Sequence, residues 1–179
     1  ETNTYSVETY KGATAYRVQS SANTKGVVSW NYLQLKGTQV TRVHKEDSMG
    51  GALQAVSDYD PGFLRFDYAW LGKAAGYSET INYERVEKDG ACNIVADSTR
   101  THVFTVESLR ESVTVPAGTF DECVKVRRTR TRGAGSMAAD DDDKRFWYCA
   151  GIGKVKELAI DTGETEELVS CNVPGGSCP

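Results

Sequence analysis

Two segments in the C-terminal part of the chain match each other as the arms of a β-hairpin. The first arm reads V-T-V-P-A-G-T-F-D-E-C-V-K-V-R-R-T-R-T-R from Val113, and the second reads D-D-D-D-K-R-F-W-Y-C from Asp140. When the numbers of paired residues sum to 272, Cys123 faces Cys149. The same register makes four further matches, which pair Val124 with Tyr148, Val126 with Phe146, Arg130 with Asp142 and Arg132 with Asp140. Because a shift by one residue would move the apolar side chains to opposite faces, we predict this hairpin, with residues 127–145 as a charged, projecting extension.

The cysteines indicate an oxidising compartment. The chain has five cysteines, no C-x-x-C motif, and two histidines that are far from any cysteine in sequence, which argues against a structural zinc site. Directly opposed cysteines of an antiparallel pair can meet disulfide geometry. We therefore predict the bridges Cys123–Cys149 and Cys171–Cys178. Cys92 is left over, and we expect it to be a buried, unreactive thiol or to form an intermolecular or alternative intramolecular bridge.

Alternation of apolar and polar residues with a period of two recurs along the whole chain. Turn residues follow at intervals of roughly eight to twelve positions, which is typical of an antiparallel meander. Residues 46–62 are the least strand-like part, where Ser48 could cap a short helix through Ala52 to Val56, and where Asp60-Pro61-Gly62 reads as a turn. We expect a mainly β fold, with residues 1–179 as a single domain. A single, strongly curved antiparallel sheet of about ten strands would form a half-barrel or barrel with little helix.

Large aromatic residues are predicted to line the concave face of this sheet. In the clearest strand of the N-terminal half, Leu64, Phe66, Tyr68 and Trp70 fall on one face. The full predicted lining, and hence the candidate ligand-binding set, is Trp30, Tyr32, Phe66, Tyr68, Trp70, Tyr83, Phe104, Phe146 and Tyr148. These rings form either an ordinary core or a cavity for an acyl chain or another apolar ligand. An empty apolar cavity above roughly 300 Å³ would favour binding, and a filled interior would favour a scaffold.

Catalytic and metal-binding patterns find little support in the sequence. His44 and His102 lie in strand-like runs, outside any nucleophile motif, which favours a surface or pairing role. The carboxylates of Glu46 and Asp47 are adjacent and would point to opposite faces of a strand. Four consecutive aspartates lack the spaced ligands of a calcium loop. We therefore predict no enzymatic activity, no cofactor and no metal. The net charge of −4 with interleaved basic residues argues against nucleic acid as a partner.

The pattern V-P-A-G-T-F-D-E-C-V-K-V, followed by F-W-Y-C-A-G-I-G-K-V-K-E and E-E-L-V-S, resembles the C-terminal half of a group of bacterial exported proteins and lipoproteins. The resemblance covers about 60 residues and implies an extracytoplasmic setting. It also implies a curved antiparallel sheet similar to the half-barrels of lipoprotein carriers of the LolA/LolB type. The chain starts at Glu1, and we expect a processed or trimmed product, with a lipid anchor as one option for the segment upstream.

The leading functional hypothesis is a non-catalytic bacterial protein of the periplasm, outer membrane or cell surface. It would act as an interaction or assembly module that contacts a protein or another envelope component through the 127–145 hairpin. The alternative is a periplasmic carrier that binds a lipid or another hydrophobic small molecule in the concave face of the sheet. The oligomeric state does not follow from the sequence.

Overall fold

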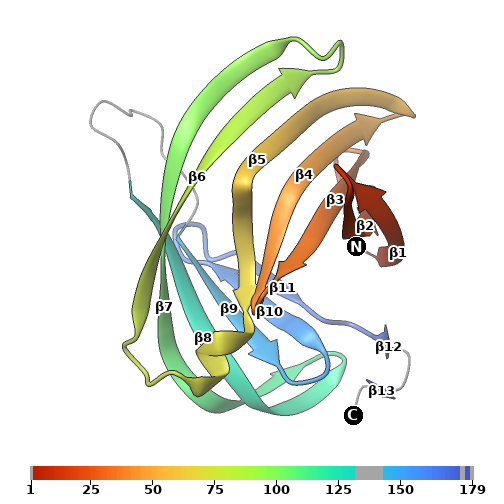
Figure 1. Cartoon of the computed structure of the whole chain (residues 1–179). Helices are drawn as coiled ribbons and strands as arrows, with labels where there is room; N and C mark the ends of the chain where they lie inside the picture. The colour runs from red at the N-terminus through yellow and green to blue at the C-terminus, as the bar shows by residue number, and fades with distance from the viewer. Residues whose placement is uncertain (1, 132–142, 174–175, 178–179) are drawn as a thin grey trace. The chain divides into compact units, whose positions relative to one another are not determined.

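The described part of the chain folds mainly into β-strands. The computed structural model describes residues 2–131, 143–173 and 176–177. Eleven strands form one antiparallel sheet whose order follows the sequence, from β1 to β11 (Figure 1). They are β1 (Asn3–Tyr10), β2 (Ala13–Ser20), β3 (Val27–Lys36), β4 (Gln39–Met49), β5 (Ala52–Asp67), β6 (Ser78–Asp89), β7 (Ile94–Val115), β8 (Gly118–Thr131), β9 (Lys144–Cys149), β10 (Gly153–Ala159) and β11 (Thr165–Glu167). A second sheet pairs β12 (Asn172–Val173) with β13 (Gly176–Ser177), and the helix η1 (Tyr68–Gly72) is a single short 3-10 segment.

The predicted antiparallel meander with little helix is confirmed. It is open, because in the described ranges no hydrogen-bonded pairing joins β1 to β11. In these ranges, no helical segment is long and apolar enough to cross a membrane.

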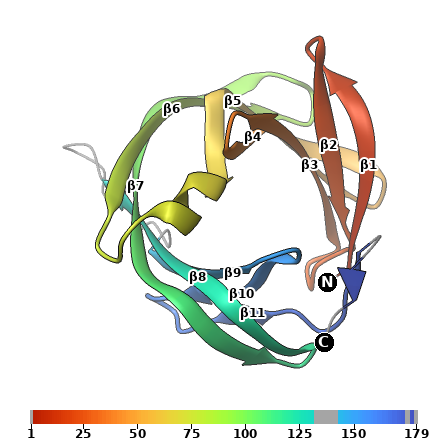
Figure 2. The same ribbon diagram turned by 60° about the horizontal axis from the view of Figure 1, so that its bottom comes forward.

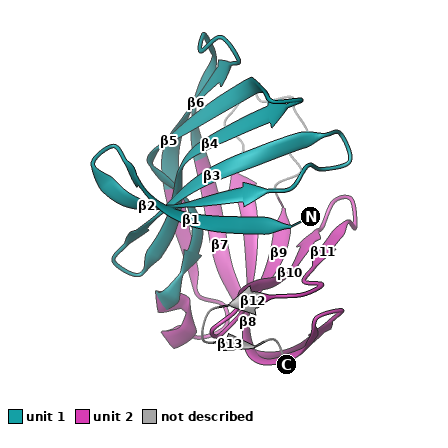
Figure 3. Cartoon of the chain, turned by 90° about the vertical axis from the view of Figure 1, so that its right-hand side faces the viewer, with its two compact units in different colours: residues 1–68, 82–100 teal, residues 69–81, 101–179 magenta. Residues whose placement is uncertain are grey.

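The chain divides into two compact units, coloured separately in Figure 3. Unit 1 comprises residues 1–68 and 82–100, and unit 2 comprises residues 69–81 and 101–179. The strands β6 and β7 contribute residues to both units. The division therefore does not decide whether residues 1–179 are one domain, which stays a prediction.

Each unit has its own buried apolar residues. Those of unit 1 include Val43, Val56, Tyr59, Phe63 and Tyr83, each at most 8% exposed. Those of unit 2 form one cluster that consists of Val113, Val115, Phe120, Cys123, Trp147, Cys149 and Val155.

The segment 46–62 differs from its prediction, because it contains neither a helix nor a turn at Pro61. Met49 pairs directly with Ala52, and Gly50 and Gly51 between them have φ of +59° and +82°. Two successive positive φ values are those of a tight hairpin turn, so pairing of β4 with β5 prevails over a short helix. Asp60-Pro61-Gly62 instead lies inside β5.

An irregularity in the β4–β5 pairing accommodates this triplet. The register moves from His44 opposite Asp58 to Arg42 opposite Phe63, so β5 carries extra residues at this point. Gly62 has φ of +139°, and a Cβ atom there would lie 2.9 Å from the Cβ atom of Thr41. Only glycine fits this close approach without displacing its neighbour.

The strand predicted to continue through Trp70 ends earlier, at Asp67. Tyr68 begins η1, and its backbone N–H donates to the Thr38 carbonyl across 2.9 Å. Inside η1, the two aromatic residues take opposite environments, since Tyr68 is 54% exposed and Trp70 is 1% exposed. The expectation that both follow strand alternation is wrong, because the chain has left the sheet at this point.

The β8–β9 hairpin of unit 2 has the predicted register. Val124 pairs with Tyr148 and Val126 pairs with Phe146, so the paired numbers sum to 272. The strands β8, β9 and β10 run side by side (Figure 2). At the described end of the hairpin, the Arg127 guanidinium donates two hydrogen bonds to the Asp143 carboxylate, across 2.9 and 2.5 Å. The predicted pairs Arg130–Asp142 and Arg132–Asp140 involve residues 132–142, which lie outside the described residues.

The predicted Cys123–Cys149 disulfide is confirmed, with 4.1 Å between the two Cα atoms. The predicted Cys171–Cys178 bridge involves Cys178, which lies outside the described residues. Cys92 is an exposed, free thiol, so the expectations of a buried thiol and of an alternative intramolecular bridge are wrong. It lies in the turn between β6 and β7, where its backbone N–H donates to the Asp89 carbonyl across 3.0 Å, and a turn residue of this kind faces solvent.

Candidate functional site

A cluster of titratable side chains in unit 1 lies on one face of its sheet. Directly opposed residues of antiparallel strands share a face. The register therefore places Arg17 of β2, Tyr32 of β3, His44 of β4 and Asp58 of β5 in one row. We define the His44 face as this row with its flanking contacts, which comprises Tyr10, Arg17, Tyr32, His44, Glu46, Asp58 and Lys88.

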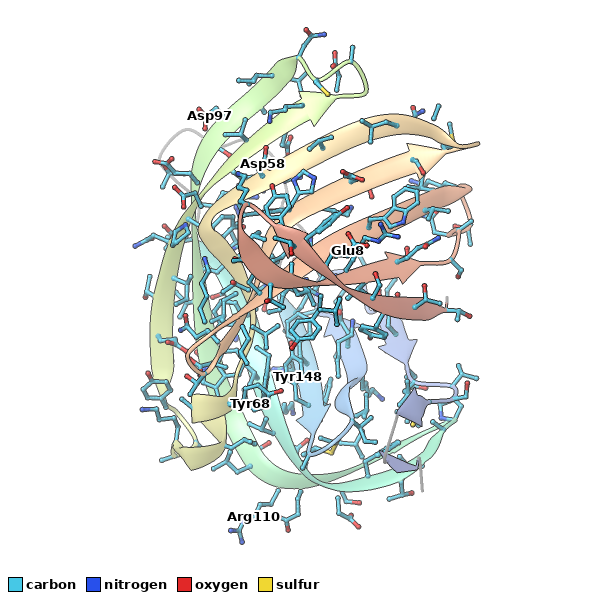
Figure 4. The ribbon with its side chains drawn as sticks, turned by 45° about the vertical axis from the view of Figure 1, so that its right-hand side comes forward. Glu8, Asp58, Tyr68, Asp97, Arg110 and Tyr148 are labelled. Atoms are coloured by element: carbon cyan, nitrogen blue, oxygen red, sulfur yellow. A yellow bond between two sulfur atoms is a disulfide. The ribbon has the colours of Figure 1, made fainter. Side chains whose placement is uncertain are left out.

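Asp58 is the centre of this cluster, since its carboxylate accepts hydrogen bonds from three other strands. The donors are the Tyr10 hydroxyl at 3.0 Å, His44 Nδ1 at 2.7 Å and Lys88 Nζ at 2.7 Å. Asp58 is labelled in Figure 4, near the turn that joins β1 to β2. Burial alone would raise the pKa of Asp58, but the hydrogen bonds from Lys88, His44 and Tyr10 outweigh it and lower the pKa to about 2. The carboxylate is therefore ionised at neutral pH.

His44 lies between two carboxylates and two aromatic rings. Its Nδ1 is 2.7 Å from Asp58 Oδ1, and its Nε2 is 3.2 Å from Glu46 Oε1. Each of its two ring nitrogens thus faces a carboxylate oxygen. The ring centroids of Tyr10 and Tyr32 are 4.9 and 5.2 Å from that of His44. The histidine is 9% exposed, so these contacts lie inside the protein.

Tyr10 brings the end of β1 onto this face. Burial, the hydrogen bond to Asp58 and the Asp58 charge all raise the pKa of Tyr10, so its hydroxyl remains a donor. Gln34 Nε2 donates to the Tyr10 carbonyl across 3.3 Å, and the Tyr10 and Tyr32 ring centroids lie 5.3 Å apart. The β1–β2 hairpin is therefore held by side-chain contacts beyond its backbone pairing with β3.

The titratable side chains of the His44 face are paired with one another. His44 makes its hydrogen bonds to Asp58 and Glu46. Asp58 is ionised and already accepts three hydrogen bonds. Over the described ranges, no group of three or more His, Cys, Asp or Glu side chains has an arrangement that could hold a metal ion.

The nine aromatic residues predicted to bind a ligand occur in both units. Trp30, Tyr32, Phe66, Tyr68 and Tyr83 belong to unit 1, and Trp70, Phe104, Phe146 and Tyr148 belong to unit 2. In unit 1, Tyr32 belongs to the His44 face. Trp30 lies two residues before Tyr32 on β3 and is therefore on the same face of the sheet. Phe66 and Tyr68 meet edge to face at 5.0 Å, whereas Tyr83 packs on Tyr59 at 5.9 Å and on Phe63 at 5.3 Å.

In unit 2, the four aromatic residues form a chain of ring contacts. Trp70 stacks on Phe104 at 5.5 Å and meets Tyr148 at 6.4 Å, and Tyr148 stacks on Phe146 at 5.9 Å. Trp70, Phe104 and Phe146 are each at most 2% exposed. Since a ring beside an empty cavity would expose surface to a water-sized probe, these three rings are packed against neighbouring atoms. Whether any of the nine residues binds a ligand stays a prediction.

An open depression of about 300 Å³ lies over the ends of β9, β10 and β11 in unit 2. It is lined by Lys144, Glu157, Ala159, Glu164, Thr165 and Glu166. Two lysines neutralise the buried Glu157, with Lys144 Nζ at 2.6 Å and Lys154 Nζ at 2.5 Å from its oxygens. This lining is polar, and so differs from the apolar cavity that would favour a lipid.

A second candidate surface lies on β1, the first strand in the sheet order. Tyr5 and Val7 are 73% and 68% exposed, and Tyr16, which pairs with Val7 across β1 and β2, is 46% exposed. We call these three residues the β1 edge patch. The sequence analysis did not single out Tyr5, Val7 or Tyr16. The signal was present, because the first strand of an open meander is an edge strand.

The cluster around Asp58 was also missed, and no local signal could have revealed it. Tyr10, Asp58 and Lys88 lie in three strands that are far apart in sequence, and their contact depends on how the sheet bends. No family model, curated protein or solved structure matches this chain. The resemblance to bacterial exported proteins and to lipoprotein carriers therefore stays a prediction.

Proposed function

We propose that the protein is a non-catalytic interaction module of an extracytoplasmic compartment, and that it binds a protein partner through the β1 edge patch. The observation that carries the proposal is the exposure of Tyr5 and Val7 on an edge strand. An edge strand presents unpaired backbone N–H and C=O groups, and apolar side chains beside them favour pairing with another strand. The titratable groups of the His44 face, by contrast, are paired with each other.

The extracytoplasmic setting is supported by the disulfide. Cys123 and Cys149 are bonded and are 0% and 5% exposed, and stable disulfides of this kind persist in oxidising compartments. A bacterial envelope is the compartment that the resemblance of the C-terminal half implies. The sequence analysis assigned the partner contact to the 127–145 hairpin, and this assignment remains a proposal. It concerns the described residues of the two arms, which include Arg127 and Asp143.

The alternative function, a carrier for a lipid or another hydrophobic molecule, requires an apolar cavity. The depression over β9–β11 is lined mainly by charged residues, and several of the predicted lining rings are packed. These observations favour the interaction module over the carrier.

A photocrosslinking residue at position 7 tests the proposal in the cells that produce the protein. The matched position is Glu166 on β11, at the other end of the strand order, where the side chain is 70% exposed. We expect light-dependent adducts to a protein from position 7 and none from position 166. Absence of adducts at position 7, or equal adducts at both positions, would overturn the proposal.

A further inference from the structure

The outer edge of β1 lacks the features that usually protect an edge strand. Proteins blunt such edges with Lys, Pro, bulges or a short strand. The sequence of β1, N-T-Y-S-V-E-T-Y, has neither Lys nor Pro, and its eight residues pair with β2 without a register shift, from Asn3–Ser20 to Tyr10–Ala13. Its one charged residue, Glu8, is paired with Arg17 at 2.9 Å. At the other end of the order, β11 has three residues, of which two are glutamates.

The backbone groups that point away from β2 can be identified. The Ser21 N–H donates to the Thr2 carbonyl across 2.6 Å, and the Thr2 N–H donates to Ser21 Oγ across 2.8 Å. Because bonding alternates along an antiparallel strand, even-numbered residues of β1 bond to β2. The N–H and C=O groups of Asn3, Tyr5, Val7 and Thr9 therefore point outward.

We propose that the outer edge of β1 pairs antiparallel with β1 of a second copy of this chain, in the register in which paired numbers sum to 12. This inference rests on the proposed function and names its partner. A two-fold axis then passes between the Ser6 residues of the two copies. Tyr5 of each copy therefore faces Val7 of the other copy. All four outward residues find backbone partners, because Asn3 pairs with Thr9 and Tyr5 pairs with Val7.

The side chains favour this register over the neighbouring registers with sums of 14 and 16. Because Val7 pairs with Tyr16 and Tyr5 pairs with Val18 inside each copy, the sum of 12 forms a continuous apolar row across four strands. On the opposite face, Glu8 meets Thr4. A sum of 16 would place Glu8 opposite Glu8, and like charges in direct opposition are destabilising. A sum of 14 would leave Tyr5 opposite Thr9, whereas odd sums would join the apolar face of one copy to the polar face of the other.

Sedimentation velocity on the purified protein over a range of concentrations tests the inference. We expect a reversible dimer, and we expect Val7→Glu to raise its dissociation constant by at least about tenfold, because the new charge faces Tyr5 of the second copy. The matched control is Val169→Glu, a substitution at a valine that is 71% exposed and lies in unit 2. This control should leave the dimer unchanged. A wild-type protein that is monomeric at all concentrations, or a dimer that is insensitive to Val7→Glu, would overturn the inference.

A cysteine at the two-fold axis tests the register without relying on a destabilising charge. In the Cys92→Ala background, which removes the exposed native thiol, Ser6→Cys should form an intermolecular disulfide, since a non-hydrogen-bonded pair brings facing side chains close together. Val7→Cys should form far less, because its partner is Tyr5. Equal bridging at both positions would exclude this register.

If the purified protein is monomeric but position 7 still crosslinks to another protein in cells, the dimer fails and the interaction module stands. If neither occurs, both fail.

Discussion

The Tyr10 hydroxyl lies 3.0 Å from Asp58 Oδ1, although three strands separate β1 from β5 in the sheet order. On a flat sheet, four steps between neighbouring strands would span about 19 Å, which is beyond the reach of a tyrosine. The β1–β2 hairpin must therefore bend over the face of β3–β5 within unit 1. Its backbone pairing with β3 is confined to Tyr16–Gln19, so the rest of the hairpin is free to bend.

The first prediction concerns the hydroxyl that holds this bend. Tyr10→Phe removes the donor to Asp58 but keeps the ring that contacts Tyr32 and His44. We expect a loss of about 1 kcal/mol in the free energy of unfolding, because a hydrogen bond to a partly buried charge is removed while the contacts of Asp58 with Lys88 and His44 remain. Hydrogen exchange of the β1 amides should also become faster.

The matched control for this variant is Tyr5→Phe. Tyr5 is on the same strand and is 73% exposed, so its hydroxyl faces solvent. Urea unfolding should give the same free energy for Tyr5→Phe and the wild type. If Tyr10→Phe were equally neutral, the hydrogen bond to Asp58 would not stabilise the bent hairpin.

The second prediction is a pH dependence from Asp58, whose pKa is lowered from its ordinary 3.8 to about 2 in the folded protein. A carboxyl with a lowered pKa stabilises the fold above its unfolded pKa and loses that contribution as pH falls through the folded pKa. The stability difference between the wild type and Asp58→Asn should thus be constant above about pH 4 and shrink towards pH 2.

Thermal unfolding of both proteins between pH 6 and pH 2 measures this difference. Asp97→Asn, at an exposed position of β7, controls for the change of one unit in net charge. A difference that stays constant down to pH 2 would contradict the assignment of Asp58 as the ionised centre of the cluster.

The third prediction compares two glutamates that contact the same lysine. The Lys154 ammonium lies 2.5 Å from a Glu157 oxygen and 2.9 Å from a Glu166 oxygen, while the two glutamate side chains are 8% and 70% exposed. Burial would raise the pKa of Glu157, but Lys154 and Lys144 lower it to about 2. We expect Glu157→Gln to cost about 2 kcal/mol, since it leaves two lysines without their buried counter-charge.

Glu166→Gln removes a contact to the same ammonium at the surface. Its cost should be within about 0.5 kcal/mol, because exposed ion pairs contribute little. Chemical unfolding of the two variants measures both values. Equal costs would show that burial of Glu157 does not decide its contribution.

The sequence predicts features that depend on neighbouring strands. The β8–β9 register follows from side chains that must match across a single pair, and Cys123, Val124 and Val126 all specify the same alignment. The meander follows for the same reason, since each turn joins strands that are adjacent in space. Residues 46–62 were assigned wrongly because Ser48 was interpreted as the cap of a short helix, although Gly50 and Gly51, which follow after one residue, are suited to a hairpin turn.

Features that depend on bending across several strands escape this reasoning. The His44 face joins six strands, and its centre, Asp58, lies in residues 46–62, the part of the sequence that looked least like a strand. Trp70 continues the two-residue spacing of Leu64 and Phe66. The strand nevertheless ends at Asp67, and the Trp70 side chain reaches its buried position from η1. Exposure of the β1 edge was predictable from strand order alone, whereas its self-complementary register requires the observed pairing with β2.

The last prediction concerns the bond that joins β8 to β9. Cys123 and Cys149 are separated by 26 residues, and a cross-link that closes a loop of this length stabilises the fold by about 3 kcal/mol through the entropy of the unfolded chain. We expect the double variant Cys123→Ala/Cys149→Ala to lose stability of this order in urea. Alanine is the suitable replacement, because a serine hydroxyl at these buried positions would add a desolvation cost. Cys92→Ala, at the exposed free thiol, should unfold like the wild type. If the double variant matched the wild type, the entropic contribution of the bridge would be offset by better packing of the alanines, and the disulfide would then report on the compartment without stabilising the hairpin.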